Sequence, residues 1–114
     1  MRKDIQRVEA VEGEYGFIWT FWLKDADGSA YTSLAGTETI TLSVQQDGGT
    51  AFTAGTGSVA DKATGELEVA IASTDAAKFD EGLHRAQIQA KGVASVLITN
   101  EVEIMIYKRI GNVA

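Results

Sequence analysis

Apolar and polar residues alternate along most of this 114-residue chain, and this period of two constrains the fold more than any other feature. Successive side chains of a strand point to opposite faces, so strict alternation predicts strands with one buried face and one wet face. Such strands are typical of antiparallel sheets. The pattern covers residues 38–46, 65–73, 83–91 and 100–108. The expected core positions are Ile40, Leu42, Val44, Leu67, Val69, Ile71, His84, Ala86, Ile88, Ala90, Val102, Ile104 and Ile106.

The segment at residues 14–23 differs, because apolar side chains fall on both of its faces. One face would carry Phe17, Trp19, Phe21 and Leu23, and the other would carry Ile18 and Trp22. The segment is therefore either a central strand that is covered on both sides or a strand with an apolar outer face. The sequence leaves both interpretations open.

Turn signals separate these strands at fairly regular spacing, at residues 25–28, 47–49, 61–65, 80–82 and 91–92. The glycine-rich segment 51–59 predicts a weak strand that is bent or lies at a sheet edge. Only residues 73–82 could be helical, as a single turn that Ser73 or Thr74 caps and that Phe79 follows by folding back onto the core. About seven short strands with such turns predict an all-β fold, an immunoglobulin-like antiparallel β-sandwich. We expect it to form one domain over residues 1–114.

Composition excludes several classes of function. The chain has 10 basic and 16 acidic residues, a net charge of −6, which argues against generic nucleic-acid binding because such binding requires a basic face. No cysteine is present, which excludes disulfides and thiolate chemistry. No segment approaches the roughly 20 apolar residues that span a bilayer, and the N-terminus lacks a signal-peptide core. We expect a soluble, unprocessed protein that binds neither nucleic acid nor membrane.

The segment after Lys24 begins like a calcium loop, because Asp25 and Asp27 precede Gly28. An EF-hand loop requires glycine at position 6 and a bidentate glutamate at position 12. Counted from Asp25, those positions hold Ala30 and Gly36. The spacing therefore predicts a turn with positive φ at Gly28 and no metal site.

His84 is the only histidine, and no zinc motif or G-x-S-x-G nucleophile elbow is present. Residues 80–84 have the form D-x-G-x-aromatic, so His84 takes the place of the corner tyrosine whose ring bonds the upstream backbone. The pairs Glu66 with Glu68 and Glu101 with Glu103 are spaced two apart on strands, as in a charged outer face. We therefore expect no catalytic residue and no cofactor.

Several turn-and-strand units follow one another in a fixed order. They are Asp27-Gly28; Leu34-Ala35-Gly36 before Ile40, Leu42 and Val44; Thr64-Gly65 before Leu67, Val69 and Ile71; and Gly82 before the strand ending at Ala90. Laid along residues 4–107, this order resembles the immunoglobulin-like domains of phage structural proteins. It is most similar to the N-terminal domain of phage baseplate upper proteins. Among the departures from that pattern, the chain has no proline, and His84 replaces the usual aromatic residue.

The resemblance implies a non-enzymatic virion structural or assembly protein, in the baseplate, tail, connector or capsid surface. Such a protein would be made in the host cytoplasm. It would bind other virion structural proteins in multiple copies, through sheet edges and its termini. The expected protein-interface residues are Ile18, Trp22, Tyr31, Met105 and Tyr107.

Two other classes of function stay open at this point. A carbohydrate- or host-surface-binding module could use the exposed aromatic residues Trp22, Tyr31 and Tyr107. A small hydrolase would require a pocket that gathers His84 with a carboxylate and a hydroxyl group.

Overall fold

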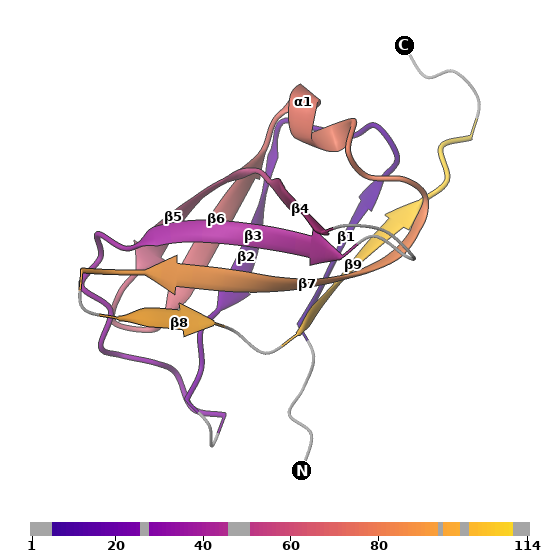
Figure 1. Ribbon diagram of the computed structural model, residues 1–114. Helices are drawn as coiled ribbons and strands as arrows, with labels where there is room; N and C mark the ends of the chain where they lie inside the picture. Colours follow the sequence, from indigo (N-terminus) through magenta and orange to yellow (C-terminus); the bar gives the residue numbers. More distant parts are fainter. Residues whose placement is uncertain (1–5, 26–27, 46–50, 94, 99–100, 111–114) are drawn as a thin grey trace.

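The computed structural model describes residues 6–25, 28–45, 51–93, 95–98 and 101–110. Among these residues, nine strands form two sheets that face each other (Figure 1). The first sheet has the order β1 (Arg7–Val11), β9 (Val102–Tyr107), β7 (Gly82–Lys91), β3 (Thr39–Gln45) and β4 (Ala51–Ala54), and β8 (Val96–Ile98) also pairs with β7. The second sheet has the order β2 (Phe17–Trp22), β6 (Glu66–Ile71) and β5 (Thr56–Asp61).

The all-β class is confirmed, and the strand pairs are antiparallel except for β1 with β9, which is parallel. Strands β1 and β8 are additional to the expected set. The expected strand at residues 51–59 is two strands in different sheets. Some sequence expectations lie outside the described residues: the positions of Asp27, of residues 4–5 and of the turn at 47–49.

The alternating residues bury the faces that the sequence predicts. All thirteen expected core positions on β3, β6, β7 and β9 are buried. Twelve of them belong to one cluster between the sheets, to which β2 adds Trp19 and Phe21, and the buried His84 contacts Phe79 of that cluster. The cause is the strand period of two, which places every second side chain on the inner face of its sheet.

Strand β2 lies at the edge of the second sheet, so the interpretation as a central strand is wrong. Trp19, Phe21 and Leu23 are buried, whereas Ile18 and Trp22 are 56% and 43% exposed. The segment therefore has an apolar outer face, which was the other interpretation.

Gly55 is where the chain passes from the first sheet to the second, between β4 and β5. Its φ is +76°, a conformation that residues with a Cβ rarely adopt. A Cβ at this position would lie 2.3 Å from Val69 Cγ1 and 2.9 Å from the Ala70 carbonyl oxygen. The expected strand at 51–59 is thus bent so sharply that its halves pair with different neighbours.

The expected helical turn is present as α1 (Ser73–Ala76), at one end of the sandwich (Figure 1). Its N-cap is Ala72, so the expected cap by Ser73 or Thr74 is wrong. The carboxylate of Asp75 instead accepts a hydrogen bond from the Ala72 amide at 3.0 Å, which satisfies that amide from inside the turn. Phe79 is buried as predicted, with its ring centroid 5.7 Å from that of Trp19.

Candidate functional site

The five residues expected at a protein interface fall in three places. Ile18 and Trp22 lie on the outer face of the second sheet, on β2. Met105 and Tyr107 lie on the outer face of the first sheet, on β9. Because the inner faces of the two sheets pack against each other, these outer faces point in opposite directions.

Tyr31 belongs to neither face. It is half-buried and packs against the core cluster. Its amide donates to the Leu23 carbonyl oxygen at 3.1 Å. A Cβ on Gly65 would lie only 2.8 Å from the Tyr31 carbonyl oxygen, so the chain is closely packed here.

Met105 and Tyr107 join two further apolar residues across three neighbouring strands. Val11 of β1 is level with Tyr107, and Leu83 of β7 is level with Met105. Val11, Leu83 and Tyr107 are 43%, 49% and 44% exposed. We call these four residues the first-sheet patch. The alternation in residues 83–91 already placed Leu83 on an outer face, so the sequence could have identified it as a surface residue. Val11 could be found only once β1 was known to pair with β9.

Charged side chains surround this patch. The hydroxyl of Tyr107 donates to the Glu9 carboxylate at 2.7 Å. That hydrogen bond is the main reason why the pKa of Tyr107 lies above its usual value. Arg85 Nε donates to the Glu101 carboxylate at 2.6 Å. These contacts orient polar groups of both signs beside the apolar residues.

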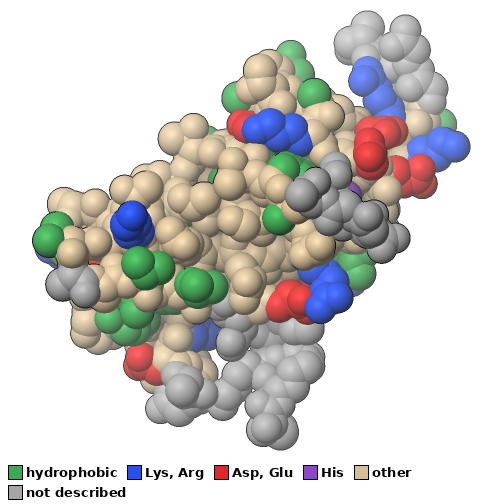
Figure 2. Space-filling model, in the orientation of Figure 1, with side chains coloured by type: hydrophobic (Ala, Val, Ile, Leu, Met, Phe, Trp, Pro, Cys, Tyr) green, Lys and Arg blue, Asp and Glu red, His purple; other side chains and the backbone are tan. Residues whose placement is uncertain are grey.

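The same face continues to β8, where Val96 and Ile98 are about half exposed. They lie level with Lys91 and Gln89 of β7. Figure 2 views this side of the molecule and shows hydrophobic side chains gathered towards the β8 end. Charged side chains of both signs lie at the opposite end of the view.

The outer face of the second sheet has a different character. Ile18, Thr20 and Trp22 of β2 lie level with Ala70, Glu68 and Glu66 of β6. The backbone of Trp22 is held by the side chain of Gln6, whose Nε2 donates to the Trp22 carbonyl and whose Oε1 accepts from the Trp22 amide, both at 2.7 Å. The Gln6 side chain thus makes the pair of hydrogen bonds that a residue of a neighbouring strand would make at the edge of β2.

Side chains also occupy backbone groups at other sheet edges. On β1, the Val11 amide donates to the Glu14 carboxylate at 2.9 Å, and Trp19 Nε1 donates to the Glu9 carbonyl at 3.2 Å. On β4, Lys78 donates to the Thr53 carbonyl at 3.0 Å. Edge strands with free backbone groups invite pairing with another chain, and these contacts oppose it.

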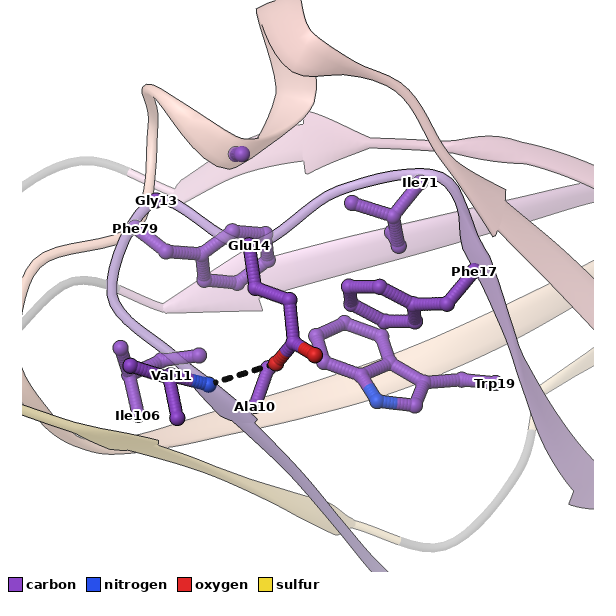
Figure 3. A pocket seen from close by; sticks show the side chains of 10 residues that line it. Ala10, Val11, Gly13, Glu14, Phe17, Trp19, Ile71, Phe79 and Ile106 are labelled. Carbon is purple, nitrogen blue, oxygen red and sulfur yellow. Dashed lines mark hydrogen bonds between the residues drawn. The ribbon is translucent and has the colours of Figure 1, made fainter. Parts of the chain in front are cut away.

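One small hollow lies at the end of the sandwich, between the β1–β2 turn and Phe79 (Figure 3). Phe17, Trp19 and Ile71 are among its apolar lining residues. Its volume of about 10 Å³ is room for about one water molecule. The Glu14 carboxylate beside it is engaged by the Val11 amide.

His84 is buried, and its Nε2 lies 2.8 Å from the Asp80 carbonyl oxygen. The predicted bond to the upstream backbone is therefore confirmed. The ring centroid also lies 5.7 Å from that of Phe79, in an edge-to-face contact.

The turn at Gly28 is as predicted in the part of it that the structure describes. Gly28 has a φ of +92° and its amide donates to the Asp25 carbonyl at 2.9 Å. No group of three or more potential metal ligands occurs among the described side chains. Within the same ranges, no helix has the length and apolar character needed to cross a membrane.

No protein-family model matches this chain, and no curated protein sequence matches it.

Proposed function

We propose that this protein is a non-enzymatic structural component of a phage particle that acts by contacts with other virion proteins. The order of turns and strands along residues 4–107, which resembles phage immunoglobulin-like domains, supports the virion context. The observation that carries the mode of action is the first-sheet patch. It presents Val11, Leu83, Met105 and Tyr107 on one exposed face.

The composition of this patch suits a protein contact. Tyrosine and methionine are enriched at interfaces, and apolar cores ringed by polar groups are the common arrangement there. Complete burial of a side chain such as leucine or methionine contributes about 1.5–3 kcal/mol. Covering three half-exposed side chains and the partly exposed Met105 is therefore a useful gain. The charged contacts of Glu9 and Arg85 would form the polar rim.

The contact would be made by sheet faces. Side chains of Gln6, Glu14 and Lys78 already occupy backbone groups at three sheet edges. Addition of a partner strand at those points would first have to displace them. This modifies the expectation from sequence that sheet edges bind the partner.

The arrangement of aromatic residues favours this proposal over a carbohydrate-binding module. Trp22 and Tyr107 lie on opposite outer faces, and Tyr31 packs against the core. The three rings therefore do not form one stacking platform.

The test uses phage particles produced from the genome that encodes the chain. We expect quantitative mass spectrometry of purified particles to find the protein at a constant copy number. A photo-crosslinking amino acid at Leu83 should join it to another virion protein, whereas the same group at exposed Thr74 on α1 should not. Particles without the chain would overturn the virion role, and equal crosslinking from both positions would overturn the assignment of the patch.

A further inference from the structure

We propose that the outer face of the second sheet is a separate docking surface, and that its partner presents lysine or arginine side chains beside apolar ones. This goes beyond the proposed function, because that function uses only the first sheet. The chain would then have two faces with different partner preferences, on opposite sides of one domain.

The apolar anchors of this surface are Ile18 and Trp22, which are about half exposed on β2. The backbone of Trp22 is held in place at the edge of β2, because the Gln6 side chain bonds both its amide and its carbonyl group at 2.7 Å. Tryptophan is among the residues most often found as binding hot spots. A side chain on a rigid backbone also loses less conformational entropy on binding.

The charged residues within the three strands of this surface are all acidic. Strands β2, β5 and β6 contain no lysine, arginine or histidine. Glu66 and Glu68 point outwards beside Trp22 and Thr20. The ion pairs found among the described residues are Lys78 with Asp75 and Arg85 with Glu101, so neither of these glutamates is in one.

The lysines nearest in sequence to this face are Lys24, which is exposed two residues after Trp22, and Lys62, in the turn between β5 and β6. Lys24 alone does not balance the two glutamates, and Lys62 is directed elsewhere. The Cδ of Lys62 lies against Gly36, 3.4 Å from where a Cβ of that glycine would be. It therefore packs beside the loop that precedes β3. Because Glu66 and Glu68 are in no ion pair among the described residues, a partner could supply their cations. A partner cation could also lie over the Trp22 ring, in a cation–π contact.

The same charges argue against a second copy of this face as the partner. Two copies meeting face to face would bring their glutamates together, and like charges at an interface are costly. The first sheet differs, because its strands carry Arg7, Arg85 and Lys91 together with Glu9 and Glu103. Charge complementarity thus selects a basic partner for the second sheet only.

The experiment titrates the ¹⁵N-labelled full chain with three soluble peptides that share one alternating leucine pattern and carry lysine, glutamine or glutamate between the leucines. We expect the lysine peptide to shift the Trp22 indole signal and the amide signals of β2 and β6. We also expect its binding to weaken at high salt, as contacts between exposed charges do. Tighter or equal binding of the glutamate peptide would overturn the proposal, as would shifts confined to the first sheet.

Variants separate this surface from the general negative charge of the protein. The double variant Glu66→Gln/Glu68→Gln should bind the lysine peptide about fivefold more weakly. Trp22→Ala should weaken binding about tenfold or more. The matched control Glu12→Gln/Glu81→Gln changes the net charge equally outside the second sheet, at the partly buried Glu12 and the exposed Glu81, and should leave the affinity unchanged. Equal loss in the control would overturn the proposal.

Light scattering of the protein alone completes the test. A monomer is expected across the concentrations used. A dimer that protects Trp22 from acrylamide quenching would show that a second copy covers this face, and would overturn the basic partner. Because Leu83 is on the other sheet, its crosslinks in particles succeed or fail independently of all these outcomes.

Discussion

Gly55 and Asp75 meet where the chain changes sheets. The Gly55 amide donates to the Asp75 carboxylate, which also accepts from the Ala72 amide at 3.0 Å. One carboxylate therefore ties the β4–β5 switch to the turn that begins α1. Gly55 and Asp75 thus hold the sharp bend that lets residues 51–61 contribute one strand to each sheet.

Replacement of Gly55 by alanine should be strongly destabilising. The new Cβ would combine a positive φ with contacts of 2.3 and 2.9 Å to Val69 and to the Ala70 carbonyl. We expect a loss of about 2–5 kcal/mol in the free energy of unfolding, measured with urea. Gly16→Ala is the matched control, because its φ is +84° but nothing lies within 4 Å, and it should lose only about 1–2 kcal/mol. Equal losses would contradict the steric explanation.

The stability contributed by Asp75 should depend on pH. Burial by itself raises the pKa of Asp75, but hydrogen bonds from the Gly55 and Ala72 amides and the charge of Lys78 together bring it below the usual value. A group with a lowered pKa in the folded state stabilises the protein above its unfolded pKa, about 3.9, and loses this contribution as the pH falls through the folded value. The difference in unfolding free energy between the wild type and Asp75→Asn should therefore be largest above about pH 4 and shrink below it. A constant difference from pH 2 to 6 would contradict this account.

Edge strands are the elements through which this domain could pair non-specifically with other chains. β2 ends the second sheet, and Gln6 lies against it while its own carbonyl accepts from the Glu103 amide of the first sheet at 2.8 Å. Gln6 thereby connects the two sheets at one side of the sandwich. Its amide side chain has a donor and an acceptor, as a strand peptide group does.

Gln6→Ala should expose the edge of β2 without altering the core. We expect the Trp22 amide to exchange with solvent about tenfold faster in hydrogen-exchange NMR, because its acceptor is lost. The Phe21 amide belongs to the other side of the same strand and serves as the internal control. Gln6→Glu retains an acceptor and should protect the Trp22 amide partly, so equal exchange in both variants would contradict the role of Gln6 as an acceptor.

The two sheets share one core, so the molecule as a whole should unfold in a single transition. Phe21 of the second sheet and Ile104 of the first are both fully buried. Their neighbours Trp22 and Met105 point outwards. The whole fold therefore separates residues that stabilise it from residues that are free to bind a partner.

Alanine substitutions should reveal this separation on both sheets. Phe21→Ala and Ile104→Ala should each lose about 2–5 kcal/mol in unfolding free energy, from lost burial and the cavity left behind. Trp22→Ala and Met105→Ala should lose about 1 kcal/mol or less. Urea denaturation followed by circular dichroism makes the comparison. A large loss in either outward variant would show that its side chain belongs to the core.

Local sequence patterns predicted much of the fold and the surroundings of His84. Alternation identified the buried faces of β3, β6, β7 and β9, and the D-x-G-x-aromatic form placed His84 against the upstream backbone. The same rule could not assign β1 or β8, because β1 has only five residues and β8 is three apolar residues without alternation. It also did not show that the strand at residues 51–59 divides at Gly55.

The sequence by itself determined which residues of each strand face inwards, since that depends on a period of two along the chain. Only the tertiary structure decided which outward residues become neighbours, because that depends on which strands share a sheet. Met105 and Tyr107 thus gained Leu83 and Val11 from distant segments. Trp22 was instead placed on the opposite side of the molecule, beside Glu66. Pairing between strands far apart in sequence makes those neighbours, and no local pattern encodes it.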